Sequence, residues 1–180
     1  MRKCPKVKIT ASSANPYLKV INNDIYSKNG KVLYSVASTK TKYKVKKSVK
    51  EIEDGAFYKN DSIKSIYLPD SIKEIGEEAF GDMENLQSIR FSRSISELDY
   101  AMFNKCKKLK TVKLPKRIQT IRGNFGGKKN CYLKKIYINA VNLKKSNLKS
   151  LPKKCKVYVK SKNVKNQVKK AGFKGKVIIR

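Results

Sequence analysis

Apolar residues recur along the chain with a period of 23 residues. The recurrence is clearest in the units 49–71, 72–94 and 95–117, and a fourth, imperfect unit covers 118–140. Six apolar columns keep their register through the first three units: Val49, Ile72, Ile95; Ile52, Ile75, Leu98; Phe57, Phe80, Phe103; Ile63, Leu86, Leu109; Ile66, Ile89, Val112; and Leu68, Phe91, Leu114. A fixed period of this length predicts a stack of similar coils, because one unit cannot bury its apolar side alone and neighbouring coils cover each other.

Each unit contains an L-x-x-I-x-L segment that predicts a short parallel strand. Alternation along the strand places Ile66 and Leu68 inward and Ser65 and Tyr67 outward. The preceding I-x-x-I-x-x-x-A-F stretch predicts a second extended piece and a short helical turn. Three glycines suit its tight corners: Gly55, Gly76 and Gly81. In the fourth unit the pattern slips by one residue, so that Leu133, Ile136 and Ile138 continue the last three columns.

Both ends of the stack need caps, since an end coil otherwise exposes its core. Residues 24–36 predict a β-hairpin, with Asn29-Gly30 as a type I′ turn. At the other end, the pattern predicts a strand at 156–159, a helix at 161–172 and a final strand at 176–180. In that helix Ser161 is the N-cap, Val164 and Val168 share one face, and Gly172 ends it.

We therefore expect one domain in three parts. These are an N-terminal capping segment with a hairpin (1–48), four 23-residue repeats (49–141) and a basic C-terminal cap (142–180).

The segment SIYLPDSIKEIGEEAFGDMENLQSI (residues 65–89) resembles the BspA-like leucine-rich repeats of Treponema and gut-bacterial surface proteins. The resemblance covers about residues 20–140. It implies a right-handed leucine-rich-repeat solenoid of the α/β class, strand-rich with short helical turns. Three places depart from the family pattern: Met102 for Ala, Ser92 for Pro, and Asn124-Phe125 for Ala-Phe.

Charge is distributed unevenly along the chain. The net charge of +31 divides into +12 for residues 1–50, −7 for 51–99 and +26 for 100–180, where there is no acidic residue. Such a field attracts polyanions and steers association. A general bias towards lysine explains the total equally well, but it explains the acid-free segment less well.

The residue types argue against an enzyme. The chain has no histidine, which excludes a histidine-based triad, and it has no glycine-rich phosphate loop and no EF-hand sequence. The paired carboxylates Glu53-Asp54 and Glu77-Glu78 fall at predicted corners, where exposed acids are ordinary. We therefore predict no catalytic residue, no cofactor and no metal site.

Four cysteines occur, Cys4, Cys106, Cys131 and Cys155, and none forms a C-x-x-C pair. Their even number allows disulfides without requiring them. Cys106 and Cys131 fall at nearly the same place in successive coils, which favours a row of buried free thiols over a disulfide.

The candidate binding residues are the outward side chains of the predicted strands. One column reads Tyr67, Arg90, Lys113, Tyr137, and the column two residues earlier reads Ser65, Ser88, Thr111, Lys135. Neither column contains an acid. This pattern suits a sulfated or phosphorylated glycan, an anionic wall polymer or an acidic protein patch, although a generic polar face fits equally well.

The resemblance implies a non-enzymatic adhesion or binding module of a cell-surface or secreted protein, with a protein or glycan ligand. The first six residues have no apolar stretch behind them and do not form a signal peptide, and no run spans a membrane. One alternative is a polyanion-binding module acting on an anionic cell-wall polymer, a sulfated glycan or nucleic acid. Sequence-specific nucleic-acid binding is not expected with six arginines and no recognition motif. Another alternative is a structural spacer in a larger surface protein.

Overall fold

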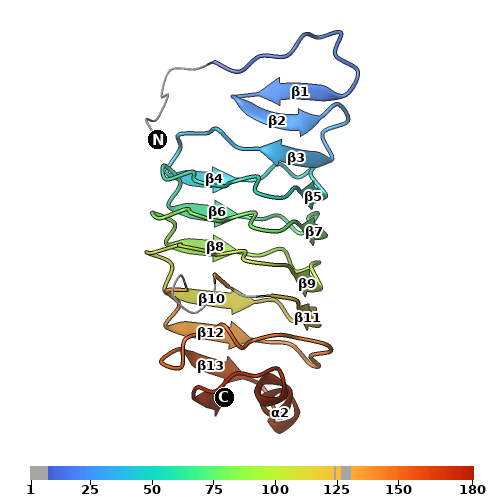
Figure 1. Ribbon diagram of the computed structural model, residues 1–180. Helices are drawn as coiled ribbons and strands as arrows, with labels where there is room; N and C mark the ends of the chain where they lie inside the picture. The colour runs from blue at the N-terminus through green and yellow to red at the C-terminus, as the bar shows by residue number, and fades with distance from the viewer. Residues whose placement is uncertain (1–7, 124, 127–130) are drawn as a thin grey trace.

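In the computed structural model, which describes residues 8–123, 125–126 and 131–180, the chain winds into an elongated stack of coils (Figure 1). One side of the stack carries the strands β4 (Lys42–Lys44), β6 (Ser65–Tyr67), β8 (Ser88–Arg90), β10 (Thr111–Leu114), β12 (Lys135–Ile138), β13 (Lys156–Val159) and β14 (Val177–Ile179). Another side carries β5 (Glu51–Ile52), β7 (Glu74–Ile75), β9 (Glu97–Leu98) and β11 (Thr120–Ile121). The predicted strand-rich solenoid is confirmed.

Neighbouring coils pair through parallel strands in the predicted register. Ile52 lies opposite Ile75 and Ile66 opposite Ile89, each 23 residues apart. Val112 lies opposite Ile136, which confirms the slip of one residue in the fourth unit. The same pairing extends outside the four predicted repeats, because β4 pairs with β6 and β13 pairs with β12. The division at residues 48 and 141 stays a prediction.

A row of phenylalanine rings runs through the core. The ring centroids of Phe57 and Phe80 are 5.3 Å apart, those of Phe80 and Phe103 5.8 Å, and those of Phe103 and Phe125 6.2 Å. All four side chains are buried. Phe125 therefore takes the place of the missing Ala-Phe in the fourth unit, while Asn124 lies outside the described residues.

The turns after the short strands repeat with the same period as the core. One left-handed corner falls at Gly55, Glu78 and Ala101, and a second falls at Lys59, Asp82 and Lys105, all with φ between 49° and 60°. The other two predicted corner glycines, Gly76 and Gly81, do not have positive φ; a Cβ there would press on Asp54 and Tyr58 respectively. Their smallness permits close approach between coils, and left-handed φ falls instead on residues that carry side chains.

The N-terminal hairpin is confirmed, but its turn type is not. It is formed by β2 (Asp24–Ser27) and β3 (Val32–Ser35), which pair antiparallel. Of the Asn29-Gly30 pair only Gly30 has a positive φ, so the turn is not type I′. Two consecutive positive φ values occur instead at Asn22 and Asn23, which join β1 (Leu18–Ile21) to β2. Strand β1 lies outside the hairpin predicted at 24–36, so this turn was not predicted.

A buried carboxylate fastens the hairpin to the first coil. Asp24 accepts hydrogen bonds from the backbone N–H groups of Ala37 (3.0 Å) and Ser38 (3.1 Å) and from the hydroxyl of Tyr43 (2.6 Å). Desolvation raises the pKa of Asp24, and these hydrogen bonds oppose the rise.

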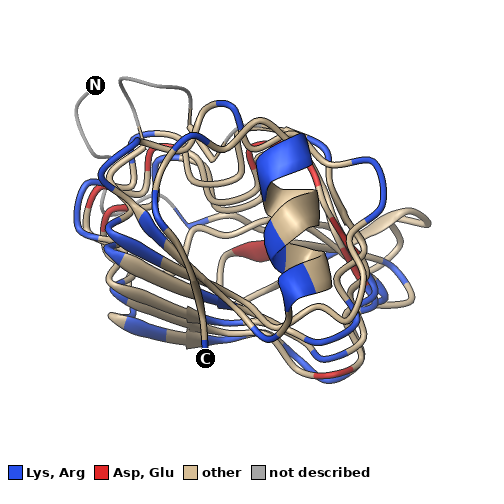
Figure 2. Ribbon diagram, turned by 90° about the horizontal axis from the view of Figure 1, so that it is seen from below, with Lys and Arg blue, Asp and Glu red and all other residues tan. Residues whose placement is uncertain are grey.

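The C-terminal cap matches its prediction closely. Helix α2 (Lys162–Lys170) begins at Ser161, whose hydroxyl accepts a hydrogen bond from the Val164 N–H at 3.2 Å. Val164 and Val168 are buried, and Gly172 follows the helix with φ of 90°. Strands β13 and β14 pair parallel beside it. The helix lies across the end of the coil stack and covers the core there (Figure 2).

Cys106, Cys131 and Cys155 are buried free thiols, as favoured from the sequence; Cys4 lies outside the described residues. The Cys106 thiol donates a hydrogen bond to the Phe80 carbonyl oxygen at 3.0 Å. Burial raises the pKa values of Cys106 and Cys155 to about 12 and that of Cys131 to about 11.

Candidate functional site

The sheet face, defined as the outward side of β4, β6, β8, β10, β12, β13 and β14, gathers the predicted binding residues. Pairing aligns them in two columns. The first is Lys44, Tyr67 and Arg90, followed by Lys113, Tyr137, Tyr158 and Ile178. The second is Lys42, Ser65 and Ser88, followed by Thr111, Lys135 and Lys156. In each column, the residues on β4, β6 and β8 adjoin those on β10, β12 and β13 where β8 and β10 lie side by side (Figure 1).

All eight residues predicted from the sequence lie on this face, and the structure adds further members. Lys42, Lys44, Lys156 and Tyr158 extend the columns at both ends, and Arg180 reaches the ring of Tyr137. A sequence signal for β4 was available, because KYKV at 42–45 stands 23 residues before SIYL at 65–68. The repeat pattern predicted from Val49 onwards does not include this segment.

Cations and neighbouring rings cover the aromatic faces of the first column. The Tyr67 ring has Lys44 Nζ at 5.3 Å and the Arg90 guanidinium at 4.6 Å from its centroid. Tyr137 stacks on Tyr158 with centroids 4.7 Å apart. Such contacts stabilise cation and ring together and fix their rotamers.

Lys113 and Arg180 approach the same Tyr137 ring, at 5.8 Å and 4.3 Å from its centroid. These cations and the stacked Tyr158 cover the faces of the Tyr137 ring. The first column therefore offers a ligand tyrosine hydroxyls and charged groups, and few open aromatic faces.

A hollow of about 350 Å³ opens on the sheet face above β4, β6 and β8. It exists because Ser65 and Ser88 are small, whereas the same column carries Thr111, Lys135 and Lys156 further along. Its lining residues include no acid: Lys42, Tyr43, Lys44, Ser65, Ile66, Tyr67, Ser88, Ile89 and Arg90.

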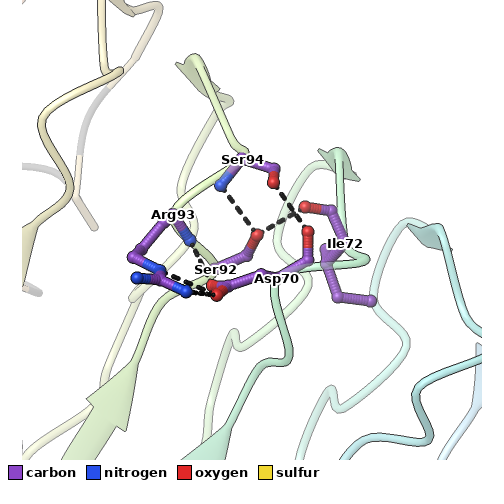
Figure 3. Close-up of polar contacts among 5 residues, drawn as sticks. All are labelled: Asp70, Ile72, Ser92, Arg93 and Ser94. Atoms are coloured by element: carbon purple, nitrogen blue, oxygen red, sulfur yellow. Dashed lines mark hydrogen bonds and ion pairs between the residues drawn. The ribbon is translucent and has the colours of Figure 1, made fainter.

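The carboxylate nearest to this hollow in the chain, Asp70, is engaged by Arg93 (Figure 3). Asp70 accepts from the Arg93 backbone N–H at 2.9 Å and from its guanidinium Nε at 2.7 Å. These hydrogen bonds hold the pKa of Asp70 below its ordinary value, with a smaller contribution from Arg90. Arg93 thus supplies the local counter-charge for Asp70.

The side with β5, β7 and β9 has the opposite character. A hollow of about 760 Å³ there is lined by six carboxylates together with Lys73 and Arg117: Glu51, Glu53, Asp54, Glu74, Glu97 and Asp99. Burial and the neighbouring Glu53 and Glu74 raise the pKa of Glu51. Among the residues that the structure describes, no group of three or more Asp, Glu or Cys side chains could hold a metal ion. Half of the twelve acidic residues of segment 51–99 therefore line one surface.

Figure 2 shows the basic end of the molecule along the coil axis, with Lys and Arg in blue on α2. The helix itself carries Lys162, Lys165, Lys169 and Lys170. No helix in the described part of the chain combines the length and apolar character needed to cross a membrane.

Comparison with known families decides the relationship that the coils suggest. The model of the BspA-type leucine-rich repeat region matches residues 18–157 in six copies. The chain belongs to the BspA-type leucine-rich repeat family. Leucine-rich repeat proteins are in general interaction or surface modules and typically not enzymes. No curated protein sequence matches the chain.

Solved structures of bacterial proteins share this BspA-type fold. The pneumococcal vaccine antigen PcpA has a TM-score of 0.68 and 22% identity, covering 94% of this chain and 49% of its own. A leucine-rich cell-surface protein of Faecalibacterium prausnitzii has a TM-score of 0.61 and 24% identity, and the match covers 91% of this chain and 39% of that protein. A leucine-rich repeat protein of Bacteroides capillosus has a TM-score of 0.53 and 19% identity, and the match covers 71% of this chain and 97% of that protein. The chain thus spans half or less of the first two structures.

Proposed function

We propose that this chain is a non-enzymatic binding module of a cell-surface or secreted protein, and that its ligand lies along the sheet face. The observation that carries the proposal is the pair of aligned columns, which place tyrosines and cations on successive strands without an acid. Repeat proteins bind along such extended faces. The family supports a surface or interaction role in general terms.

The test is a binding screen of the whole chain against glycans and matrix proteins at physiological salt, followed by two triple variants. The sheet-face variant carries Tyr67→Ala, Lys113→Glu and Tyr137→Ala. The matched control carries Tyr17→Ala, Tyr34→Ala and Lys73→Glu, which makes the same changes elsewhere on the surface. We expect the sheet-face variant to lose about tenfold or more in affinity, since aromatic and cationic residues dominate binding energies. Equal losses in both variants contradict the proposal. A chain that binds nothing in the screen favours the structural spacer instead.

A second candidate function, the binding of polyanions by diffuse charge, is favoured by residues 100–180, which contain 26 basic residues and no acid. Binding of this kind weakens steeply with salt, because it depends on the release of counterions. Heparin and duplex DNA titrated at 50 mM and 200 mM NaCl test it. An affinity that hardly changes between the two salt concentrations rules it out.

A further inference from the structure

The hollow on the sheet face brings three cations to one small space. Lys42 and Lys44 come from β4, and Arg90 comes from β8 on the far side of β6. Within the described part of the chain, none of the three forms an ion pair, and Asp70, whose pKa Arg90 helps to lower, is held by Arg93. The hollow therefore gathers three positive charges that repel one another and that have no ion-paired carboxylate in the described residues.

Hydrogen-bond donors without partners lie between the cations. The hydroxyls of Ser65 and Ser88 sit opposite each other on adjacent strands, and neither makes a hydrogen bond within the part of the chain described. The Arg90 guanidinium is already stacked on Tyr67, so its N–H groups are oriented before a ligand arrives. A fixed guanidinium fork with flanking ammonium groups is suited to an oxyanion.

The volume of the hollow and the covered ring of Tyr67 restrict the kinds of ligand that can bind there. A volume of about 350 Å³ lies at the small end of ligand pockets, which hold about 300–1,000 Å³, so it accommodates one group and not a whole polymer. Single-stranded nucleic acids bind by stacking bases on open aromatic faces. Tyr67 offers no such open face, because Lys44 and Arg90 flank its ring.

From this arrangement we infer that the hollow over β4, β6 and β8 binds one phosphate or sulfate ester group of a linear glycan-type polymer. Lys42, Lys44 and Arg90 bind the oxygens from opposite rims, and the hydroxyls of Ser65 and Ser88 donate from the floor. The rest of the polymer lies along the columns towards β13. The inference rests on the proposed function, because it specifies the ligand of the same face.

The central test places a carboxylate in the hollow and, as a matched control, in the same column outside it. Ser65→Asp lies in the hollow, and Thr111→Asp lies two strands further along. The probes are a heparin-derived hexasaccharide, which carries sulfates, and a glycerol phosphate hexamer, which carries phosphates, titrated calorimetrically. We expect Ser65→Asp to lose about tenfold or more in affinity, and Thr111→Asp, which faces only the rest of the polymer, to lose about threefold. The hexamer bound more tightly by the unmodified chain identifies the source of the oxyanion.

A second pair guards against a folding defect in Ser65→Asp. Arg90→Ala and Lys113→Ala each remove one cation that contacts a tyrosine, inside and outside the hollow respectively. The circular dichroism spectrum of each variant is compared with that of the unmodified chain. We expect Arg90→Ala to lose about tenfold in affinity and Lys113→Ala about threefold, because Arg90 binds the ester oxygens whereas Lys113 faces only the rest of the polymer.

Each other outcome contradicts the inference in a distinct way. Equal losses in all four variants show diffuse attraction, which overturns the hollow as a site and leaves the sheet-face proposal intact. Binding unchanged in all four places the ligand elsewhere and overturns both. Binding of neither hexamer overturns the inference, while the glycan and matrix-protein screen still decides the proposed function. If hexaglutamate binds more tightly than both hexamers, the phosphate or sulfate ester group is overturned, because its anions are carboxylates. If a thymidine hexanucleotide binds more tightly than both, the glycan-type polymer is overturned.

Discussion

At the scale of single residues, departures from the repeat have local structural reasons. Ser92 stands where Pro69 and Pro115 stand in neighbouring units. Its buried hydroxyl donates to the Ile72 carbonyl oxygen at 2.6 Å and accepts from the Ser94 N–H at 3.0 Å (Figure 3). A proline could make neither contact. The serine therefore exchanges a rigid turn for two hydrogen bonds, one to the distant Ile72 and one to the nearby Ser94.

We predict that Ser92→Ala lowers the free energy of unfolding by about 1–2 kcal/mol, because it leaves a buried carbonyl and an N–H unpaired. Urea denaturation at pH 7 measures the change. Ser88→Ala is the control: its hydroxyl is exposed and unbonded in the described structure, so stability should stay within about 0.5 kcal/mol. Similar effects of both substitutions would show that the Ser92 contacts do not stabilise the fold.

The left-handed corners lead to a second prediction at this scale. Ala101 has φ of 50°, at the position that Gly55 occupies two coils earlier. In this conformation the Cβ of alanine costs about 1–2 kcal/mol, which glycine avoids. Glycine also gives the unfolded chain more conformational entropy, which offsets part of this gain. Ala101→Gly should therefore raise the free energy of unfolding by about 0.5–1 kcal/mol.

The control for this corner is Ala79→Gly. Ala79 is buried and is not among the described residues with positive φ, so the substitution should destabilise the fold. Thermal unfolding of both variants measures the difference. Destabilisation by Ala101→Gly would refute the strain argument.

At the scale of elements, the caps were the most predictable parts that are not repeats. Helix α2 follows local rules: a serine at its N-cap, valines four residues apart on the buried face and a glycine after its end. The hairpin of β2 and β3 followed from alternating apolar residues, but its turn type depended on which residues took positive φ. Strand β4 could be recognised only through its pairing with β6, because a strand of three residues shows too little alternation to be predicted by itself.

We predict that Ser161→Ala loosens the C-terminal cap by about 1 kcal/mol, because the Val164 N–H loses its acceptor. Hydrogen exchange of the amides of α2 and β14 should speed up roughly fivefold, since 1 kcal/mol corresponds to about that factor. Ser161→Asp restores an acceptor and should exchange like the unmodified chain. Unchanged exchange in Ser161→Ala contradicts a role for the cap.

At the scale of the whole molecule, buried thiols in successive coils make stability depend on pH. Folding raises the pKa values of Cys106 and Cys155 to about 12 and that of Cys131 to about 11, from 9.0. Above pH 9 the unfolded chain releases these protons while the folded chain keeps them. The stabilisation is therefore complete below pH 9 and is lost progressively as the pH rises towards 11–12.

We predict that each thiol lowers the free energy of unfolding by about 1.4 kcal/mol between pH 8 and pH 10. Comparing the chain with Cys155→Ala under reducing conditions isolates one thiol, because the lysines titrate equally in both. The stability difference between them should shrink by that amount over this range. With Ser88→Ala the difference should stay constant. A constant difference for Cys155→Ala would show that the thiol is not buried.

The molecule as a whole separates its charges by face. Six of the twelve acids of segment 51–99 line the hollow on the side with β5, β7 and β9, whereas the columns of the sheet face have none. Each residue of a column repeats every 23 positions, so a charge preference in one unit becomes a stripe when the coils stack. A charge preference at one position of the repeat thereby becomes a stripe along one face of the molecule.

The sequence alone determined the repeat period, the inward columns, the slip in the fourth unit and eight members of the sheet face. These follow from local alternation and from a period that any stacking must respect. Only the tertiary structure decided how side chains from different coils meet. Pairing β4 with β6 and β8 placed Lys42 and Lys44 across from Arg90 and left a hollow over two serines. Contacts between coils depend on side-chain size and rotamers in neighbouring units, which no single unit specifies.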